Sequence, residues 1–228
     1  MSSDGILKTN SIEIRLATVG DVESMTNLHC RSFLPEEQVP MALGRHYVRA
    51  TYRWLVTNKE AYALVADYDK NVIGLVGMCD RSFTFPMFSA CLPEFFQSIL
   101  KNPSLLTNIR LWKRLSRRPI VTGEHSKLIV NYPAVAQMTI GAVDSGFRGL
   151  DIFPSLISSV KEISKARGSR AILAGIYKTN NPCRRAFIKD DWHEAAELET
   201  PDTVFYMALL DEKIAGELKL EHRSEAIS

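Results

Sequence analysis

The apolar positions of the chain change their period from one segment to the next. Residues 11–18, SIEIRLAT, alternate apolar and polar side chains, and this two-residue period predicts a half-buried strand. Residues 18–33 repeat their apolar positions near helical spacing, which predicts a helix with Thr18 or Asp21 as its cap. Residues 41–57 predict another helix.

Two β-rich runs follow within residues 61–80, and the turn between them, rich in Asp and Asn, predicts a hairpin. Residues 81–130 interrupt this order. They predict two short helices broken at Asn102-Pro103, because the residue before a proline disfavours the helical conformation. The second of these helices is amphipathic, and its basic side chains are Arg110, Lys113, Arg114, Arg117 and Arg118.

The second half of the chain alternates strands and helices. We expect strands at residues 134–143, 170–177 and 203–210, and helices at residues 152–167 and 180–190. Gly168 follows the basic end of the first of these helices, where a terminating glycine is typical. The whole order, β-α-α-β-β-insert-β-α-β-α-β, predicts an α/β domain around a mixed sheet.

The composition fits a packed domain of this kind. The chain has 228 residues, of which 46% are hydrophobic and 24% charged, so a packed core is expected and global disorder is not. The formal net charge of +2 gives no reason to expect nucleic-acid binding. The four scattered cysteines form no CxxC pair, which argues against a zinc site or disulfide framework and for reduced thiols.

We expect neither a targeting segment nor a membrane span. The first ten residues are polar and lack the apolar core of a signal peptide. No uninterrupted apolar run reaches the ~18 residues that a membrane helix needs. The sequence therefore predicts a soluble, cytoplasmic protein.

Two local patterns carry the strongest functional signal. Residues 142–152 read AVDSGFRGLDI and join a predicted strand to a predicted helix, whose first amides lack intrahelical partners. Those amides and the positive end of the helix dipole favour an anion such as a pyrophosphate. The second pattern, at residues 180–192, reads NNPCRRAFIKDDW and begins the next helix.

Together the two patterns resemble the GNAT N-acetyltransferase superfamily, and the resemblance covers about residues 12–80 and 134–210. The first is similar to a family pattern V-D-P-E-Y-R-G-x-G-I-G, and the second to N-x-P-A-x-x-L-Y-x-x-x-G-F. The positions that carry the resemblance are Val143, Asp144, Phe147, Arg148, Gly149 and Ile152 in the first pattern and Asn180, Pro182, Cys183 and Trp192 in the second.

The resemblance implies a mostly antiparallel central sheet flanked by helices. It implies one domain over residues 1–215, with residues 81–130 as a helical insertion and residues 216–228 as a polar tail. It also implies acetyl-CoA or another acyl-CoA as co-substrate, no metal, and a small-molecule primary amine as acceptor. The coenzyme-binding residues that it implies are Gly141, Val143, Arg148, Gly149, Leu150, Asp151, Ile152, Phe153 and Asn180.

Three side chains depart from the family pattern. Asp151 and Phe153 stand where the family has glycines, which permit positive φ and a close approach of the backbone to a phosphate. A carboxylate at this place repels a diphosphate, unless Asp151 points outward and caps the helix. Phe187 stands where the family often has a tyrosine that protonates the leaving thiolate, and a phenylalanine donates no proton.

The sequence marks no residue clearly as the catalytic base. Asp80 ends a predicted strand, His125 lies in a polar loop, and Tyr177 ends the strand before the second pattern. Each is a candidate acid or base. The plainer interpretations are a turn residue, a solvated loop residue and a core or rim tyrosine, respectively. Asn180 predicts a helix cap as well as a coenzyme contact.

The insertion leaves further alternatives open. Its basic residues suit an acidic acyl-carrier protein as donor, or they form a solvated helix face. Its aromatic residues line an acceptor pocket or pack the insertion onto the domain; they are Phe83, Phe85, Phe88, Phe95, Phe96 and Trp112. Our first hypothesis is an N-acyltransferase. Because of the three departures, the second is a degenerate fold that binds a ligand or partner without turnover.

Overall fold

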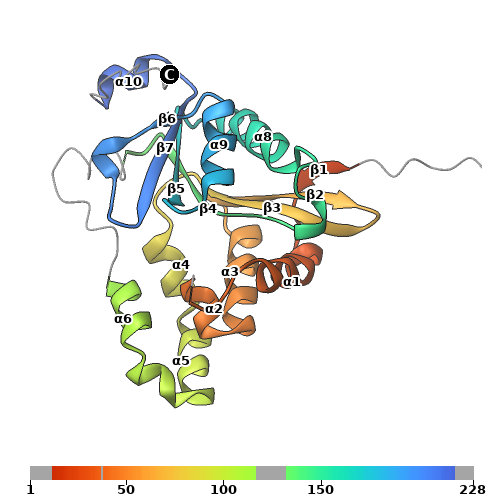
Figure 1. Cartoon of the computed structure of the whole chain (residues 1–228), viewed down its shortest axis with the longest axis vertical. Helices are drawn as coiled ribbons and strands as arrows, with labels where there is room; N and C mark the ends of the chain where they lie inside the picture. Colours follow the sequence, from red (N-terminus) through yellow and green to blue (C-terminus); the bar gives the residue numbers. More distant parts are fainter. Residues whose placement is uncertain (1–11, 37, 117–131, 219–228) are drawn as a thin grey trace, which may run out of the picture.

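The computed structural model describes residues 12–36, 38–116 and 132–218, which form a central sheet with helices on both faces (Figure 1). The strands are β1 (Glu13–Leu16), β2 (Ala61–Tyr68), β3 (Asn71–Cys79), β4 (Val135–Val143), β5 (Ala171–Tyr177), β6 (His193–Glu194) and β7 (Thr203–Leu209). Their order in the sheet is β1-β2-β3-β4-β5-β7-β6. Only the β4–β5 pair is parallel among these strands, which confirms the predicted mixed, mostly antiparallel sheet.

Helices and short 3-10 turns connect these strands. The helices are α1 (Val22–Ser32), α2 (Val39–Leu43), α3 (Arg45–Thr57), α4 (Thr84–Ala90), α5 (Leu92–Lys101), α6 (Ile109–Ser116), α8 (Ile152–Ala166), α9 (Asn181–Lys189) and α10 (Lys213–Glu217). The 3-10 turns are η1 (Val19–Asp21), η2 (Pro103–Thr107), η3 (Ser145–Phe147) and η4 (Ala196–Leu198).

Two apolar layers hold the helices on the sheet. On one face, Leu156 and Val160 of α8 are fully buried in a cluster that includes strands β2 to β5. On the other face, α1 and α3 pack Met25, Val48 and Tyr52 onto β2 and β3. Burying each such side chain contributes roughly 1.5–3 kcal/mol, so the apolar periodicity seen in the sequence explains which helix faces meet the sheet.

The insertion is helical and packs on α2 and α3, below the sheet in Figure 1. Leu43 and Tyr47 of the domain bury Phe95, Leu105 and Leu111 of the insertion. The predicted break at Asn102-Pro103 is confirmed, since α5 ends at residue 101 and η2 begins at residue 103. Arg117, Arg118 and His125 lie outside the described residues, as do the side chains of Arg110 and Arg114.

The structure departs from the sequence analysis at three places. The helix expected over residues 41–57 is two helices, because Gly44 adopts φ +99° and turns the chain between α2 and α3. The two-residue strand β6 was not predicted, since a run this short carries no period. The polar tail expected from residue 216 begins with ordered contacts, because Leu218 is fully buried and Glu217 forms an ion pair with Arg170.

The lengths of the described helices and the state of the cysteines relate to two expectations from the sequence. Within these ranges, no helix is both long and apolar enough to cross a membrane. The four cysteines, Cys30, Cys79, Cys91 and Cys183, carry free thiols.

Gly74 on β3 allows α8 to approach the sheet closely. A Cβ atom at Gly74 would lie 2.9 Å from Ile152 Cγ2 and 3.2 Å from Leu156 Cδ1. We expect Gly74→Ala to destabilise the protein by about 1–3 kcal/mol through overpacking, measured by urea unfolding. The control Gly216→Ala, where a Cβ meets no atom within 4 Å, should be neutral or slightly stabilising. A neutral Gly74→Ala would contradict this packing.

Candidate functional site

Strands β4 and β5 pair only over the first part of their length. Their parallel register runs from Val135 opposite Ala171 to Met138 opposite Ala174. Beyond that point β4 continues against β3 alone, and β5 continues against β7. The register between β3 and β4 shifts at Thr139, which has no partner on β3 and forms a bulge. Such a bulge bends the strand, so it explains why β4 diverges from β5 here.

The divergence leaves backbone groups of β4 facing the gap. The amide of Asp144 donates to Ile73 O of β3 at 2.8 Å. Because alternate residues of an antiparallel ladder bond to the same neighbour, the N–H and C=O groups of Gly141 and Val143 face away from β3, toward the gap. The predicted coenzyme residues on β4 are therefore at an open strand edge.

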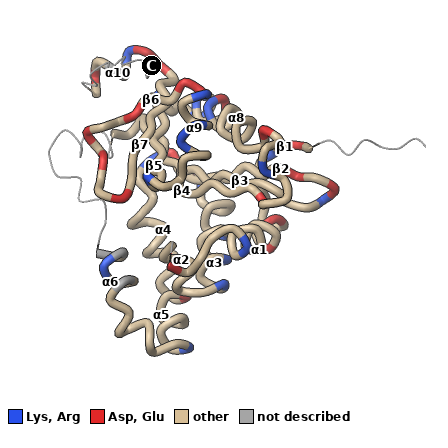
Figure 2. The backbone as a smooth tube through the Cα atoms, viewed as in Figure 1, with Lys and Arg blue, Asp and Glu red and all other residues tan. Residues whose placement is uncertain are grey.

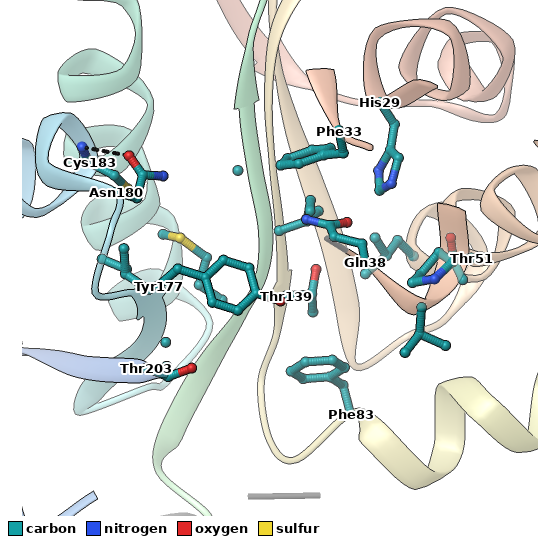
Figure 3. A pocket seen from close by; sticks show the side chains of 18 of the residues that line it. His29, Phe33, Gln38, Thr51, Phe83, Thr139, Tyr177, Asn180, Cys183 and Thr203 are labelled. Atoms are coloured by element: carbon teal, nitrogen blue, oxygen red, sulfur yellow. Dashed lines mark hydrogen bonds between the residues drawn. The ribbon is translucent and has the colours of Figure 1, made fainter. Parts of the chain in front are cut away.

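A cavity of about 490 Å³ occupies the gap and continues beneath α1 and α3. In Figure 3, His29, Phe33, Gln38 and Thr51 lie on one side of it, Tyr177, Asn180, Cys183 and Thr203 on the other, and Thr139 between them. The tube in Figure 2 is tan along β3 and β4, which carry no charged residue. The described residues that line the cavity include no Asp, Glu, Lys or Arg.

The loop from β4 to α8 keeps the twisted backbone that the sequence pattern predicts. Gly149 adopts φ +83° and Asp151 φ +52°, so Asp151 takes a left-handed conformation that suits glycine. The amides of residues 149–153 have no acceptor within the described part of the chain. They lie at the N-terminus of a 15-residue helix, where an anion is favoured.

Asp151 does not cap α8 as one of our alternatives proposed. It occupies the N-cap position, but its side chain accepts no capping hydrogen bond. Its carbonyl oxygen instead accepts hydrogen bonds from the amide and hydroxyl groups of Ser155. The left-handed backbone turns the side chain away from the capping geometry, which requires an extended N-cap residue.

Phe153 fills space beside the open strand edge. A Cβ atom at Gly141 would lie 2.8 Å from the Phe153 ring, and the ring centroid lies 5.8 Å from that of Phe187. The ring therefore lies against β4 at Gly141 and in contact with α9, and it forms part of the cavity wall. At the position of the second glycine in the family pattern, this chain therefore has a side chain that narrows the gap between β4 and β5.

Phe187 belongs to the core as much as to the cavity. Its side chain is fully buried. It packs edge-on against Trp192 at 4.6 Å and stacks on Tyr206 at 5.7 Å between ring centroids. Its ring supplies no acid at the cavity.

The candidates from the sequence fall at different places. Tyr177 lines the cavity and is 45% exposed. Asn180 also lines it, and its side chain caps α9 by accepting a hydrogen bond from the Cys183 amide at 3.2 Å, which confirms the predicted cap. Asp80 does not line the cavity, and Arg167 donates to both of its carboxylate oxygens at 2.9 and 2.6 Å.

The remaining coenzyme residues lie in the loop, outside the cavity wall. Leu150 is 59% exposed, whereas Ile152 is buried against Gly74 and offers only its amide to the loop. The side chain of Asp144 accepts hydrogen bonds from the Gly146 amide and from Arg31 of α1, so it holds the loop against the opposite side of the sheet.

Sequence reasoning missed a buried pair on the cavity. His29 of α1 is 3% exposed, and its Nδ1 lies 2.8 Å from the hydroxyl oxygen of Tyr52 on α3. Its Nε2 has no partner among the described residues. The signal was present, because His29 follows Met25 by four residues and so lies on the apolar face of the helix.

Burial without an ionic partner lowers the pKa of His29 to about 4. The unfolded chain binds a proton here below about pH 6.5, whereas the folded protein remains unprotonated until about pH 4. This contribution to stability is present above pH 6.5 and is lost as the pH falls toward 4. We expect the free energy of unfolding to fall by about 2 kcal/mol between pH 7 and pH 5, measured in urea.

The matched variant His29→Gln retains a polar side chain without this titration. It should remove most of the pH dependence between pH 5 and 7. The ion pair of Asp21 with Arg15, which lowers the pKa of that carboxyl to about 2, adds a separate loss of stability only below about pH 4. An unchanged slope in His29→Gln would show that the histidine is not the titrating group.

No group of three or more His, Cys, Asp or Glu side chains in the described ranges has the arrangement of a metal site. The described cavity wall carries hydroxyl groups, the amides of Gln38 and Asn180, the thiol of Cys183 and the imidazole of His29.

Comparison with solved structures places this arrangement in a known fold. The GNAT domain of S. lividans PAT is 12% identical, over 87% of this chain and 90% of that domain, with a TM-score of 0.57. PaiA N-acetyltransferase from Thermoplasma acidophilum, in complex with coenzyme A, is 11% identical over 87% of this chain and 99% of that chain, with a TM-score of 0.56.

A third structure is that of YncA from Salmonella typhimurium with its cofactor acetyl-CoA. It is 14% identical over 89% of this chain and 96% of that chain, with a TM-score of 0.57. No family model matches the sequence. No curated protein sequence matches it either. The structural similarity establishes the fold that the two sequence patterns predicted. Because the identities are low, the activity must be argued from the site.

Proposed function

We propose that this chain, which has the fold of the GNAT acetyltransferases, transfers an acetyl or other acyl group from an acyl-CoA to the primary amine of a small molecule. The observation that carries the proposal is the gap between β4 and β5. An extended thioester arm placed there meets the backbone groups of Gly141 and Val143, as an added strand would.

The donor side of this proposal uses backbone groups. The amides of residues 149–153 receive the diphosphate at the start of α8. The amide of Val143 or Gly141 donates to the thioester carbonyl oxygen and stabilises the charge that develops on it. Acyl-CoA itself supplies the activated thioester.

The transfer step needs a neutral amine. The amine nitrogen attacks the carbonyl carbon, the C–N bond forms, and the C–S bond breaks. The nitrogen releases one proton to water, and the thiolate takes one from the hydroxyl group of Tyr177, which lies on the cavity. Tyr177 then regains a proton from water, and it acts in place of the tyrosine that the family often has at the position of Phe187.

A second candidate function is ligand binding without turnover. The position of the Phe153 ring favours it, because the ring lies against Gly141, where the arm of the coenzyme would pass. An acyl-carrier protein is a further possible donor, since its phosphopantetheine has one phosphate and needs less of the loop. The basic residues proposed to receive that carrier lie mostly outside the described side chains. We also propose a cytoplasmic location, which suits the four free thiols.

The deciding experiment is a calorimetric titration with acetyl-CoA, followed by a thiol-release assay with a panel of primary amines. Binding with amine-dependent thiol release would support the acyltransferase. Absence of binding at millimolar acetyl-CoA would overturn the CoA-dependent proposal, and an acyl-carrier protein would then be tested as donor. Binding without thiol release from any amine would favour the non-catalytic candidate.

A further inference from the structure

Two buried polar atoms without a partner point to the same cavity. Among the described side chains, the buried nitrogen and oxygen atoms that lack a hydrogen-bond partner are His29 Nε2 and Thr139 Oγ1. Both residues line the cavity between β4 and β5. Leaving such an atom unpaired costs about 1–3 kcal/mol, so a ligand that enters the cavity and pairs with either atom removes that cost.

Thr139 directs its hydroxyl group toward the α3 side of the sheet. A Cβ atom at Gly77 would lie 2.5 Å from Thr139 Oγ1 and 2.9 Å from Leu55 Cδ1 of α3. The missing side chain at Gly77 therefore makes room for the hydroxyl group on the face that α1 and α3 cover. The bulge places this residue at the point where β4 leaves β5.

His29 reaches the same side of the cavity from α1. The Tyr52 hydroxyl group holds the ring through Nδ1, and Phe33 packs against the ring at 4.8 Å between centroids. These contacts fix the ring, and Nε2 has no partner among the described residues. In the tautomer that carries its proton on Nδ1, the ring donates to Tyr52 and Nε2 accepts.

The surroundings select against charge. The lining on this side of the cavity is apolar or aromatic, with Phe33, Val39, Leu55, Phe83 and Met87. The described lining offers no carboxylate to an ammonium group, and His29 is neutral above about pH 4. An ammonium ion would be desolvated here without a counter-charge, which is costly, whereas a neutral amine on an apolar body would not.

We propose that the acceptor of this protein is an apolar amine, such as an arylalkylamine, bound in its neutral form by His29 Nε2 and Thr139 Oγ1. A primary amine has two N–H donors and one lone pair. His29 and Thr139 accept from the two donors, and the lone pair is left free to attack a thioester. The inference rests on the proposed function for its role as acceptor, but the binding site itself can be tested without a donor.

The test is a calorimetric titration of the full chain with 2-phenylethylamine, without acyl-CoA, at pH 6, 7 and 8. The apparent dissociation constant should fall about tenfold per pH unit, because the neutral fraction of the amine rises tenfold. The other ionisable groups near His29 or on the cavity are Cys30, Tyr52, Tyr177 and Cys183. Burial raises the pKa of Tyr52, and that of Cys183 to about 12, so neither titrates in this range.

Variants test the two contacts. Thr139→Val and His29→Phe should each weaken binding by about 3- to 10-fold, which corresponds to one hydrogen bond. The matched control is Thr26→Val on α1, whose buried hydroxyl group donates to Val22 O and does not line the cavity. It should leave binding unchanged. Cadaverine, which carries two amino groups and no aromatic body, should bind more weakly than 2-phenylethylamine.

Three outcomes would overturn the inference: an affinity that does not change with pH, wild-type affinity in both Thr139→Val and His29→Phe, or tighter binding of cadaverine than of 2-phenylethylamine. These outcomes are distinct from failure of the proposed function. If 2-phenylethylamine binds as expected but acetyl-CoA neither binds nor releases thiol, the amine site stands and the CoA-dependent transferase does not. If thiol is released only with diamines, the transferase stands and this acceptor class does not.

Discussion

Phe187→Ala is expected to destabilise the protein by about 3–5 kcal/mol. The Phe187 side chain is fully buried and contacts the rings of Trp192, Tyr206 and Phe153, so its removal leaves a cavity lined by rigid rings. These rings belong to the segment between α9 and β6, to β7 and to α8, and they cannot collapse together into the space. The measurement is the free energy of unfolding from urea denaturation.

The control for this variant is Phe85→Ala on α4, where the ring is 65% exposed. It should change the stability by less than about 0.5 kcal/mol, as is usual for exposed positions. If Phe187→Ala costs less than about 1 kcal/mol, the ring is not part of a packed core. The replacement of the family's tyrosine would then need another explanation than packing.

The sequence predicted those parts of the fold and site that depend on local patterns. The first strand, the hairpin and α8 follow from apolar periodicity, and the Asn180 cap follows from an asparagine at a helix start. The glycine-rich pattern also predicted the shape of the β4–α8 loop. Asp151 retains the left-handed backbone although its residue type has changed. Each of these features is determined within about four residues of chain.

Features that depend on distant contacts were missed or left open. His29 becomes functionally interesting only because it lines the cavity while Tyr52, 23 residues later, fixes one ring nitrogen and the other has no partner among the described residues. The bulge at Thr139 is visible only as a register shift against β3. Asp80 lies outside the cavity and pairs with Arg167, 87 residues away, which no local pattern indicated.

The difference between local patterns and distant contacts also applies to Asp151 and Phe153 in the β4–α8 loop. The sequence could place Asp151 and Phe153 at glycine positions, but not the directions of their side chains. The structure separates them: Asp151 is exposed, whereas the Phe153 ring packs inward against Gly141. The Phe153 ring is therefore the main obstacle to a coenzyme. The exposed Asp151 carboxylate repels a diphosphate only weakly, because water and salt screen the charges.

Phe153→Ala is accordingly expected to tighten acetyl-CoA binding by about tenfold or more. If the arm of the coenzyme runs past Gly141, the Phe153 ring must first leave its contacts with β4 and Phe187. Exposing a ring of this size costs roughly 1.5–3 kcal/mol, which corresponds to about 10- to 100-fold in the dissociation constant. The alanine variant no longer bears that cost when it binds. The dissociation constant is measured by calorimetry.

The matched control is Ile163→Ala, on the same helix and against the same core, but away from the cavity. Both variants should lose stability, whereas only Phe153→Ala should gain affinity, so the comparison separates an opened gap from a loosened domain. Asp151→Gly should add a smaller gain that disappears in high salt, because it acts through charge. If Phe153→Ala leaves the affinity unchanged or weaker, the ring is either outside the path of the arm or part of its binding surface. In the second case the phenylalanine replaces the glycine as a contact for the coenzyme, and the loop has been rebuilt around it.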